Sequence, residues 1–118
     1  MDYPKSVDEI ITQKEKPAVA IDDHGFITWI NENFTKAYGW TSQDIVGKSV
    51  TSIMPEKYRE LHQIGFSRFL TTEQSKLAGK PLPLEVLFKD GTVKSAEHFI
   101  LAEKKDGRWR LAATIALR

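Results

Sequence analysis

The residues of this chain that could transfer protons are its histidines. An imidazole titrates near neutral pH, so His62 and His98, with the carboxylate of Glu97, have the side chains of a general acid and base. Glu97 and His98 are neighbours in a stretch that alternates like a strand, so they should point to opposite faces. No nucleophile or oxyanion donor is identifiable beside them, and three scattered histidines make no metal motif. We therefore do not expect an enzyme.

His62 lies within the longest predicted helix. This helix opens at Pro55, because proline at the first helical position loses no hydrogen bond that the helix could have used. Apolar residues then recur at intervals of three and four, which predicts a buried stripe with His62 in its middle. The stripe comprises Tyr58, Leu61, His62, Gly65, Phe66 and Phe69. Glycine inside a helix costs about 1 kcal/mol relative to alanine, so Gly65 suggests that something needs the room beside it.

The segment before this helix, residues 21–48, predicts a hairpin followed by small helices. Two apolar runs, 18–21 and 26–30, flank a turn that ends in Gly25, and His24 should be a solvated residue of that turn. The side-chain oxygen of Asn31 can cap a helix that stops at Gly39. Thr41 and Asp44 have the spacing of a capping box for a second short helix, ended by Gly47. Residues 49–54 should form one further helical turn.

The second half of the chain predicts three strands. Residues 71–76 should form a polar loop, and Pro81 and Pro83 confine the start of the strand over 77–88 to a sheet edge or a bulge. The strands over 93–103 and 109–117 follow turns at Asp90-Gly91 and Asp106-Gly107. The expected inner faces carry Leu82, Leu84, Val86 and Phe88; Ala96, His98, Ile100 and Ala102; and Trp109, Leu111, Ala113, Ile115 and Leu117.

Residues 1–16 predict a short amphipathic cap helix. Ser6 and Glu9 form a capping-box pattern, so we expect a helix from about Val7 to Glu15 that ends before Pro17. Such a helix is marginal alone, so its apolar residues Ile10 and Ile11 must pack on something. They either cover this domain's own sheet or form a dimer contact. With Phe99 and Leu101 on the outer sheet face they would make an apolar patch, so we expect a homodimer.

An ordered set of residues gives the chain a family resemblance. The spacing D-x-x-G-x-I-x-x-x-N over 22–31, then Phe34, Tyr38-Gly39-Trp40 and DIVGK over 44–48, resembles the opening half of a PAS sensory domain. LFKDGTV and KKDGRWRLAATI resemble its closing meander, so the resemblance covers about residues 16–117. It implies an α+β fold: a five-stranded antiparallel sheet with small helices and one longer helix on one face, after the N-terminal helix. We expect a cap over 1–16 and the PAS domain over 17–118.

The resemblance also implies a cavity between sheet and helices that binds a small ligand or cofactor. The segment PEKYRELH, with the apolar and basic residues after it, is similar to haem-binding oxygen-sensor PAS domains, and His62 falls at the place of their proximal histidine. That makes haem b a candidate, with His62 as the ligand of the iron. The implied wall is Tyr58, Leu61, Phe66 and Phe69, the implied propionate partners are Arg59 and Arg68, and the implied sheet side is Leu84, His98 and Ile100.

The same residues are also compatible with another ligand, or with no ligand at all. The oxygen sensors use an arginine in the strand region where this chain offers only Lys80, so oxygen sensing is less supported than haem binding. Flavin is not expected, because the flavin-binding PAS domains that this chain could resemble use an aromatic residue in the strand after the long helix, and residues 82–87 provide none. His62 is otherwise a half-buried histidine beside an unidentified small molecule or an empty cavity. A cofactor-free dimerisation or protein-interaction module is the further alternative.

Length and charge limit the remaining classes. A chain of 118 residues supports one hydrophobic core, and a scattered net charge of +1 does not suggest nucleic-acid binding. No apolar run reaches membrane-spanning length and no signal-peptide pattern is present, so we expect a cytoplasmic protein. Without cysteine there is no disulfide and no cysteine-attached flavin or hydroxycinnamate. We expect the input part of a bacterial two-component signalling protein, with its output domain elsewhere in a longer parent or on a partner.

Overall fold

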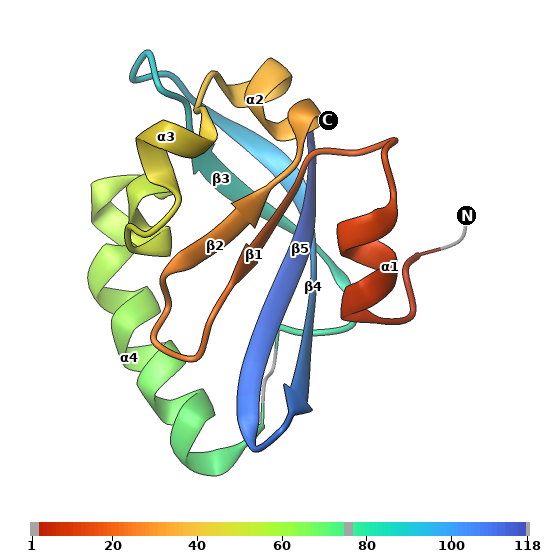
Figure 1. Ribbon diagram of the computed structural model, residues 1–118. Coiled ribbons are helices and arrows are strands. Elements are labelled where there is room, and N and C mark those ends of the chain that lie inside the picture. Colours follow the sequence, from red (N-terminus) through yellow and green to blue (C-terminus); the bar gives the residue numbers. More distant parts are fainter. Residues whose placement is uncertain (1–2, 75–76, 118) are drawn as a thin grey trace.

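The computed structural model describes residues 3–74 and 77–117. Its centre is one antiparallel sheet with the strand order β2-β1-β5-β4-β3 (Figure 1). The strands are β1 (Ala18–Ile21), β2 (Ile27–Ile30), β3 (Pro81–Leu87), β4 (Val93–Lys105) and β5 (Arg108–Leu117). This confirms the predicted five-stranded α+β fold, in which the first and last strands of the domain lie side by side at the middle of the sheet.

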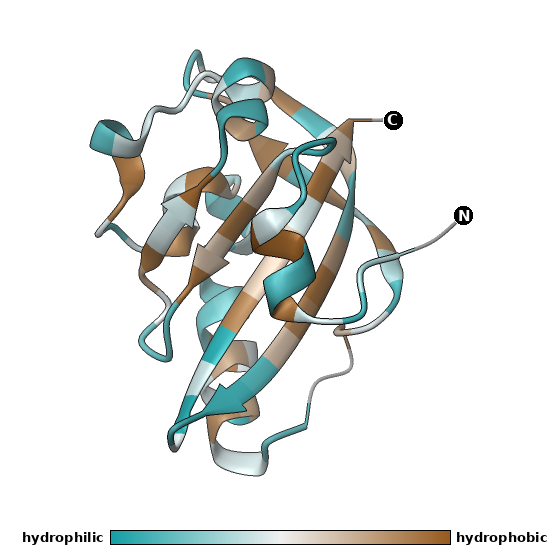
Figure 2. Ribbon diagram, turned by 45° about the vertical axis from the view of Figure 1, so that its right-hand side comes forward, coloured by the Kyte–Doolittle hydropathy of each residue, from teal (hydrophilic) through white to brown (hydrophobic). Residues whose placement is uncertain are grey.

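Helices cover both faces of the sheet. The helices α2 (Glu32–Tyr38), α3 (Ser42–Ile45), η1 (Val50–Ile53) and α4 (Glu56–Thr72) lie on one side, which we call the inner face, and α1 (Val7–Thr12) lies on the other, the outer face (Figure 1). The main core lies on the inner face, around Phe34 and Tyr38 of α2. A smaller core beneath α1 contains Ile10, which packs with Ala20 and Ala112. Figure 2 shows hydrophobic stretches along the strands beneath α1.

The local signals between residues 21 and 47 produced the expected elements. Asp22 Oδ1 accepts hydrogen bonds from the backbone N–H groups of His24 and Phe26, which closes the hairpin turn. Asn31 caps α2 by accepting from the Phe34 N–H at 2.9 Å, and its side chain also accepts from the Ala18 N–H at 3.0 Å. This residue therefore joins the start of α2 to the start of β1.

The prolines lie where strand chemistry requires them. Strand β3 forms one edge of the sheet, and both Pro81 and Pro83 are exposed on it. Successive residues of an edge strand direct their backbone groups alternately toward the neighbouring strand and toward solvent. Pro81 and Pro83 are two residues apart and so share one phase, and proline, which has no N–H, is tolerated in an edge strand where that phase faces solvent. The edge thereby lacks two donors that another strand would need.

Three predicted boundaries were wrong. Helix α1 ends at Thr12 rather than at residue 15, because the Gln13 side chain accepts from the N–H groups of Glu15 and Lys16 and so stabilises a turn. Helix α4 continues through Thr72 into the expected polar loop, of which residues 75 and 76 lie outside the described part. Strand β3 begins at Pro81 rather than at residue 77.

The outer-face packing decides the open alternative for Ile10 but not for Ile11, which is half-buried. Ile10 is fully buried against this domain's own sheet, as one of the two interpretations predicted. Phe99 is 6% exposed, because the ring of Tyr3 stacks on it at a centroid distance of 4.6 Å.

Among the described residues, no helix is long and apolar enough to span a membrane.

Candidate functional site

Helix α4 buries less of its apolar stripe than its periodicity predicted. Phe69 is buried and His62 and Phe66 are half-buried, but Leu61 is 68% exposed and Tyr58 is 40% exposed. The expectation that all of these residues face the interior was wrong for Leu61 and Tyr58. Gly65 is also exposed, and a Cβ built on it would meet nothing within 4 Å. Within the described chain nothing needs the room that Gly65 leaves.

The buried part of α4 forms a series of stacked rings. The imidazole of His62 lies nearly parallel to the ring of Phe66, with centroids 5.8 Å apart. Phe66 stacks on Phe69 at 6.3 Å, and Phe69 meets the edge of Trp109 in β5 at 4.9 Å. Burial lowers the pKa of His62 below its ordinary value. Burial therefore favours the neutral form of the His62 imidazole, which lies against the ring of Phe66.

Polar contacts hold α4 near each end. The Tyr58 hydroxyl donates to Glu85 Oε1 of β3 at 2.7 Å, and Lys104 of β4 pairs with Glu73 just after the helix. The Tyr58 hydroxyl and the adjacent Lys57 ammonium lower the pKa of Glu85. Arg59, an expected propionate partner, donates instead to the Met54 carbonyl at 3.2 Å, and Arg68 is exposed.

The residues expected on the sheet side, Leu84, His98 and Ile100, lie on the inner face of the sheet. Ala96 is buried in the inner core and Ile100 packs against it, so the alternation in β4 directs His98 inward as predicted. Nδ1 of His98 lies 3.0 Å from the Ala96 carbonyl oxygen. Burial lowers the pKa of His98, and the bond to Ala96 partly opposes that shift. Leu84, also half-buried, pairs with Ala96 in the neighbouring strand.

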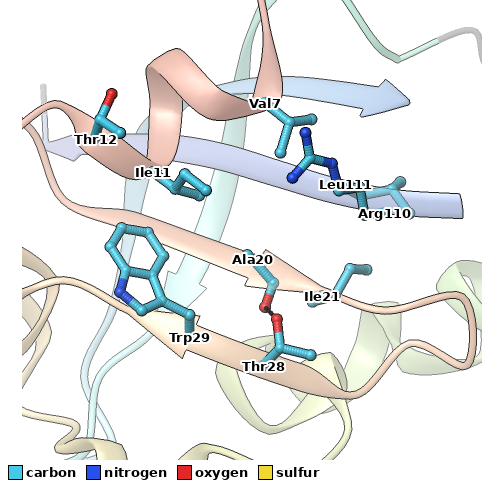
Figure 3. Close-up of a pocket in the computed structure, with 9 residues that line it drawn as sticks. All are labelled: Val7, Ile11, Thr12, Ala20, Ile21, Thr28, Trp29, Arg110 and Leu111. Atoms are coloured by element: carbon cyan, nitrogen blue, oxygen red, sulfur yellow. Dashed lines mark hydrogen bonds between the residues drawn. The ribbon is translucent and has the colours of Figure 1, made fainter. Parts of the chain in front are cut away.

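Two hollows in the described part of the chain lie away from these histidines. One, of about 650 Å³, is an open depression lined by Pro55, Glu56, Lys57, Glu85 and Val93. The other, of about 380 Å³, lies on the outer face beside α1 (Figure 3). Haem needs an iron ligand and also an enclosed apolar space for the porphyrin. His62 supplies the donor, but neither hollow is lined by it, and Tyr58 and Leu61 face outward, so this arrangement does not fit haem.

Of the residues that line the outer hollow, sequence reasoning singled out Ile11 but not Trp29 or Arg110. Trp29 and Arg110 come from β2 and β5, and Ile11 comes from α1. A signal was available in the strand alternation, which directs Trp29 away from its buried neighbour Ile30. Only the fold shows that this tryptophan meets α1.

A comparison with protein families identifies the fold. The family model described as PAS fold matches residues 6–99. The chain belongs to the PAS family. PAS domains are sensory and interaction modules of signalling proteins, not a catalytic family. The matched range includes α1, the strands β1 to β3 and the first half of β4.

Individual relatives support this assignment of a PAS domain. An uncharacterised protein of Azorhizobium caulinodans is 28% identical over 98 residues, which is 82% of this chain and 13% of the relative. The sensor protein FixL of Bradyrhizobium diazoefficiens is 28% identical over 89 residues, 75% of this chain and 17% of FixL. This PAS domain thus spans less than a fifth of either relative.

A solved structure shows the same fold. The PAS domain of an HTR-like protein from Haloarcula marismortui superposes with a TM-score of 0.72 at 18% identity, covering 95% of this chain and 88% of that one. At this level of identity the likeness concerns the path of the chain. It confirms the arrangement of the five-stranded sheet and its helices.

Proposed function

We propose that this PAS domain is the input domain of a longer signalling protein and senses a small ligand bound between α4 and the inner face of the sheet. The observation that carries the proposal is that two half-buried imidazoles, His62 from the helix layer and His98 from the sheet, lie on the same side of the sheet. Burying polar rings has a cost unless they find partners. A ligand that hydrogen-bonds to them in this apolar setting would offset that cost.

The attachment of α4 to the sheet suits a sensor. Its aromatic side chains meet the sheet layer at a few places, among them Phe66 against the hairpin at Gly25 and Phe69 against Trp109. The side of α4 that carries Leu61 is open to solvent. A ligand can shift α4 only if it binds one position of the helix more tightly than another, and a sparsely packed helix has such alternatives at low cost.

The test is to identify what the purified protein holds. Mass spectrometry of the denatured protein should release a small molecule from the wild type and from Gln63→Ala, an exposed neighbour on α4, but not from His62→Ala. Absorbance after incubation with haem tests the haem alternative, for which a strong Soret band lost only in His62→Ala is the positive result. A colourless protein that releases no compound would contradict ligand sensing.

A second candidate function is a cofactor-free dimerisation module. It is favoured by Ile11, which remains half-exposed next to α1's buried Ile10. Sedimentation of the wild type and of Ile11→Arg tests this candidate. A dimer that Ile11→Arg converts to monomer supports it, and a monomeric wild type contradicts it.

The setting of the domain is also a proposal. The relatives extend far beyond the matched region, which supports a parent protein with an output domain elsewhere in its chain. We propose a bacterial two-component protein, cytoplasmic in this part, with residues 1–16 as a cap and 17–118 as the sensory unit. The full-length parent should show ligand-dependent output that is lost on His62→Ala.

A further inference from the structure

The solvent face of α4 carries apolar side chains that nothing in the described part of the chain covers. Ile64 is 52% exposed, and Leu61, one turn before it, is 68% exposed. With 3.6 residues per turn, Ile64 lies opposite the side of the helix that carries the half-buried His62 and Phe66. In Figure 1, α4 runs along one flank of the molecule. A partner can therefore reach this face.

Two charged residues flank Ile64 at equal spacing. Glu60 lies four residues before it and Arg68 four residues after it, so all three side chains share one face of the helix. Both charged residues are exposed. Within the described residues, the ion pairs that hold α4 use Lys57 and, just after the helix, Glu73, and they leave Glu60 and Arg68 without one. Their charges are therefore available to a partner.

This arrangement of charges is complementary to itself. In an antiparallel pair of α4 helices with a two-fold axis at Ile64, a residue four positions before Ile64 in one copy faces the residue four positions after it in the other. Glu60 of each copy then meets Arg68 of the other, about 6 Å along the helix on either side of the axis. A parallel pair would bring Glu60 against Glu60 and Arg68 against Arg68, which is unfavourable. The charges therefore favour an antiparallel pair of identical chains.

We propose that two copies of this domain associate through the solvent faces of their α4 helices, antiparallel about Ile64. Leu61 and Ile64 form the apolar centre of the contact, and the pairs of Glu60 with Arg68 form its rim. Each copy contributes one helix of 17 residues, so the contact belongs with small, transient interfaces rather than permanent ones.

The proposed contact is separate from both candidate functions. The dimer considered there uses Ile11 of α1, on the outer face of the sheet, whereas α4 lies over the inner face. The small ligand is proposed next to His62, on the side of α4 that faces away from Ile64. Each of the three proposals can therefore fail without the others.

Sedimentation velocity over a range of protein concentrations tests the contact. The wild type should show a monomer–dimer equilibrium, and Ile64→Arg should raise the dissociation constant at least about tenfold, because it places two positive charges at the axis. Val93→Arg, a matched change at a 39% exposed position of β4, should leave the dissociation constant unchanged, and so should Ile11→Arg. A wild type that stays monomeric at every concentration, or a dimer that Ile64→Arg leaves intact, would overturn the proposal.

Exchanging the two charges tests the antiparallel arrangement. Glu60→Arg alone, or Arg68→Glu alone, places like charges opposite each other on both sides of the axis and should weaken the dimer about fivefold. The double variant Glu60→Arg/Arg68→Glu restores opposite charges and should recover the dissociation constant of the wild type. Both positions are exposed, so all three variants should fold, which circular dichroism checks. A double variant that dimerises no better than the single variants would show that these charges do not face each other.

Discussion

The ring of His98 donates a hydrogen bond from Nδ1 to the carbonyl oxygen of Ala96, 3.0 Å away in the same strand. A carbonyl oxygen can only accept, so Nδ1 must carry the proton and, in the neutral ring, Nε2 is left as an acceptor. The strand itself thereby fixes which ring nitrogen, Nε2, is available to accept a hydrogen bond from a ligand. NMR nitrogen shifts should show the Nδ1–H tautomer, and a predominant Nε2–H form would contradict this geometry.

The same burial predicts a dependence of stability on pH. Burial lowers the pKa of both His62 and His98, so the unfolded chain binds these protons more readily than the folded chain does. The free energy of unfolding should therefore decrease as the pH falls through the ordinary value of about 6.5, and level off below the folded-state pKa values. His98→Asn keeps an N–H near Ala96 but does not titrate, so it should reduce the decrease between pH 7.5 and 5.5. An unchanged slope would mean that His98 is not the buried titrating group.

Asn31 should be the most sensitive polar position of the fold. Its side chain accepts from the backbone N–H groups of Ala18 and Phe34 and donates to the Lys16 carbonyl at 2.9 Å. Asn31→Ala removes a helix cap and leaves a strand N–H without its acceptor, so it should lower the free energy of unfolding by about 2–3 kcal/mol. Urea denaturation measures this. Asn33→Ala, which loses one exposed bond to Lys14, is the control and should cost under about 1 kcal/mol.

Asn31 also shows which parts of the fold the sequence predicts well. A helix cap and the Thr41–Asp44 capping box depend on residues three positions apart, so their signals are complete within a short segment. The inward direction of His98 followed from alternation for the same reason. These features depend on local chemistry, which distant packing did not override.

The candidate site was less predictable because its geometry depends on distant residues. Helix α4 has apolar side chains outside the expected stripe, with Ile64 52% and Leu70 36% exposed, so its period did not determine one buried face. Tyr58 is directed outward, where its hydroxyl donates a hydrogen bond to Glu85, a residue 27 positions later in the sequence. The outer hollow beside α1 combines segments from both ends of the chain. No single stretch of the sequence contains the residues that decide the direction of Tyr58, or those that form the outer hollow.

Gly65→Ala should stabilise the protein. Gly65 lies inside α4 and a Cβ there meets nothing within 4 Å, so alanine restores helix propensity worth about 0.5–1 kcal/mol without a clash. Gly39→Ala is the matched contrast, because Gly39 has φ +88° and its Cβ would lie 3.3 Å from the Lys89 Cβ. That change should destabilise. Urea denaturation of both variants gives the comparison, and a destabilised Gly65→Ala would show that the space beside α4 is used after all.

Asp44 should contribute to stability in acid. The backbone N–H of Thr41 donates to its carboxylate, and Lys89 pairs with it at 2.9 Å, and these lower the pKa of Asp44 to about 2. Because the folded-state pKa is depressed, the stabilisation is present above the ordinary value of 3.8 and is lost as the pH falls through about 2. Asp44→Asn should therefore make unfolding less dependent on pH between about 4 and 2. Lys89→Met should have a smaller effect, since the Thr41 bond is the larger cause. If wild type and Asp44→Asn lose stability in parallel over this range, the acid sensitivity arises from another carboxylate.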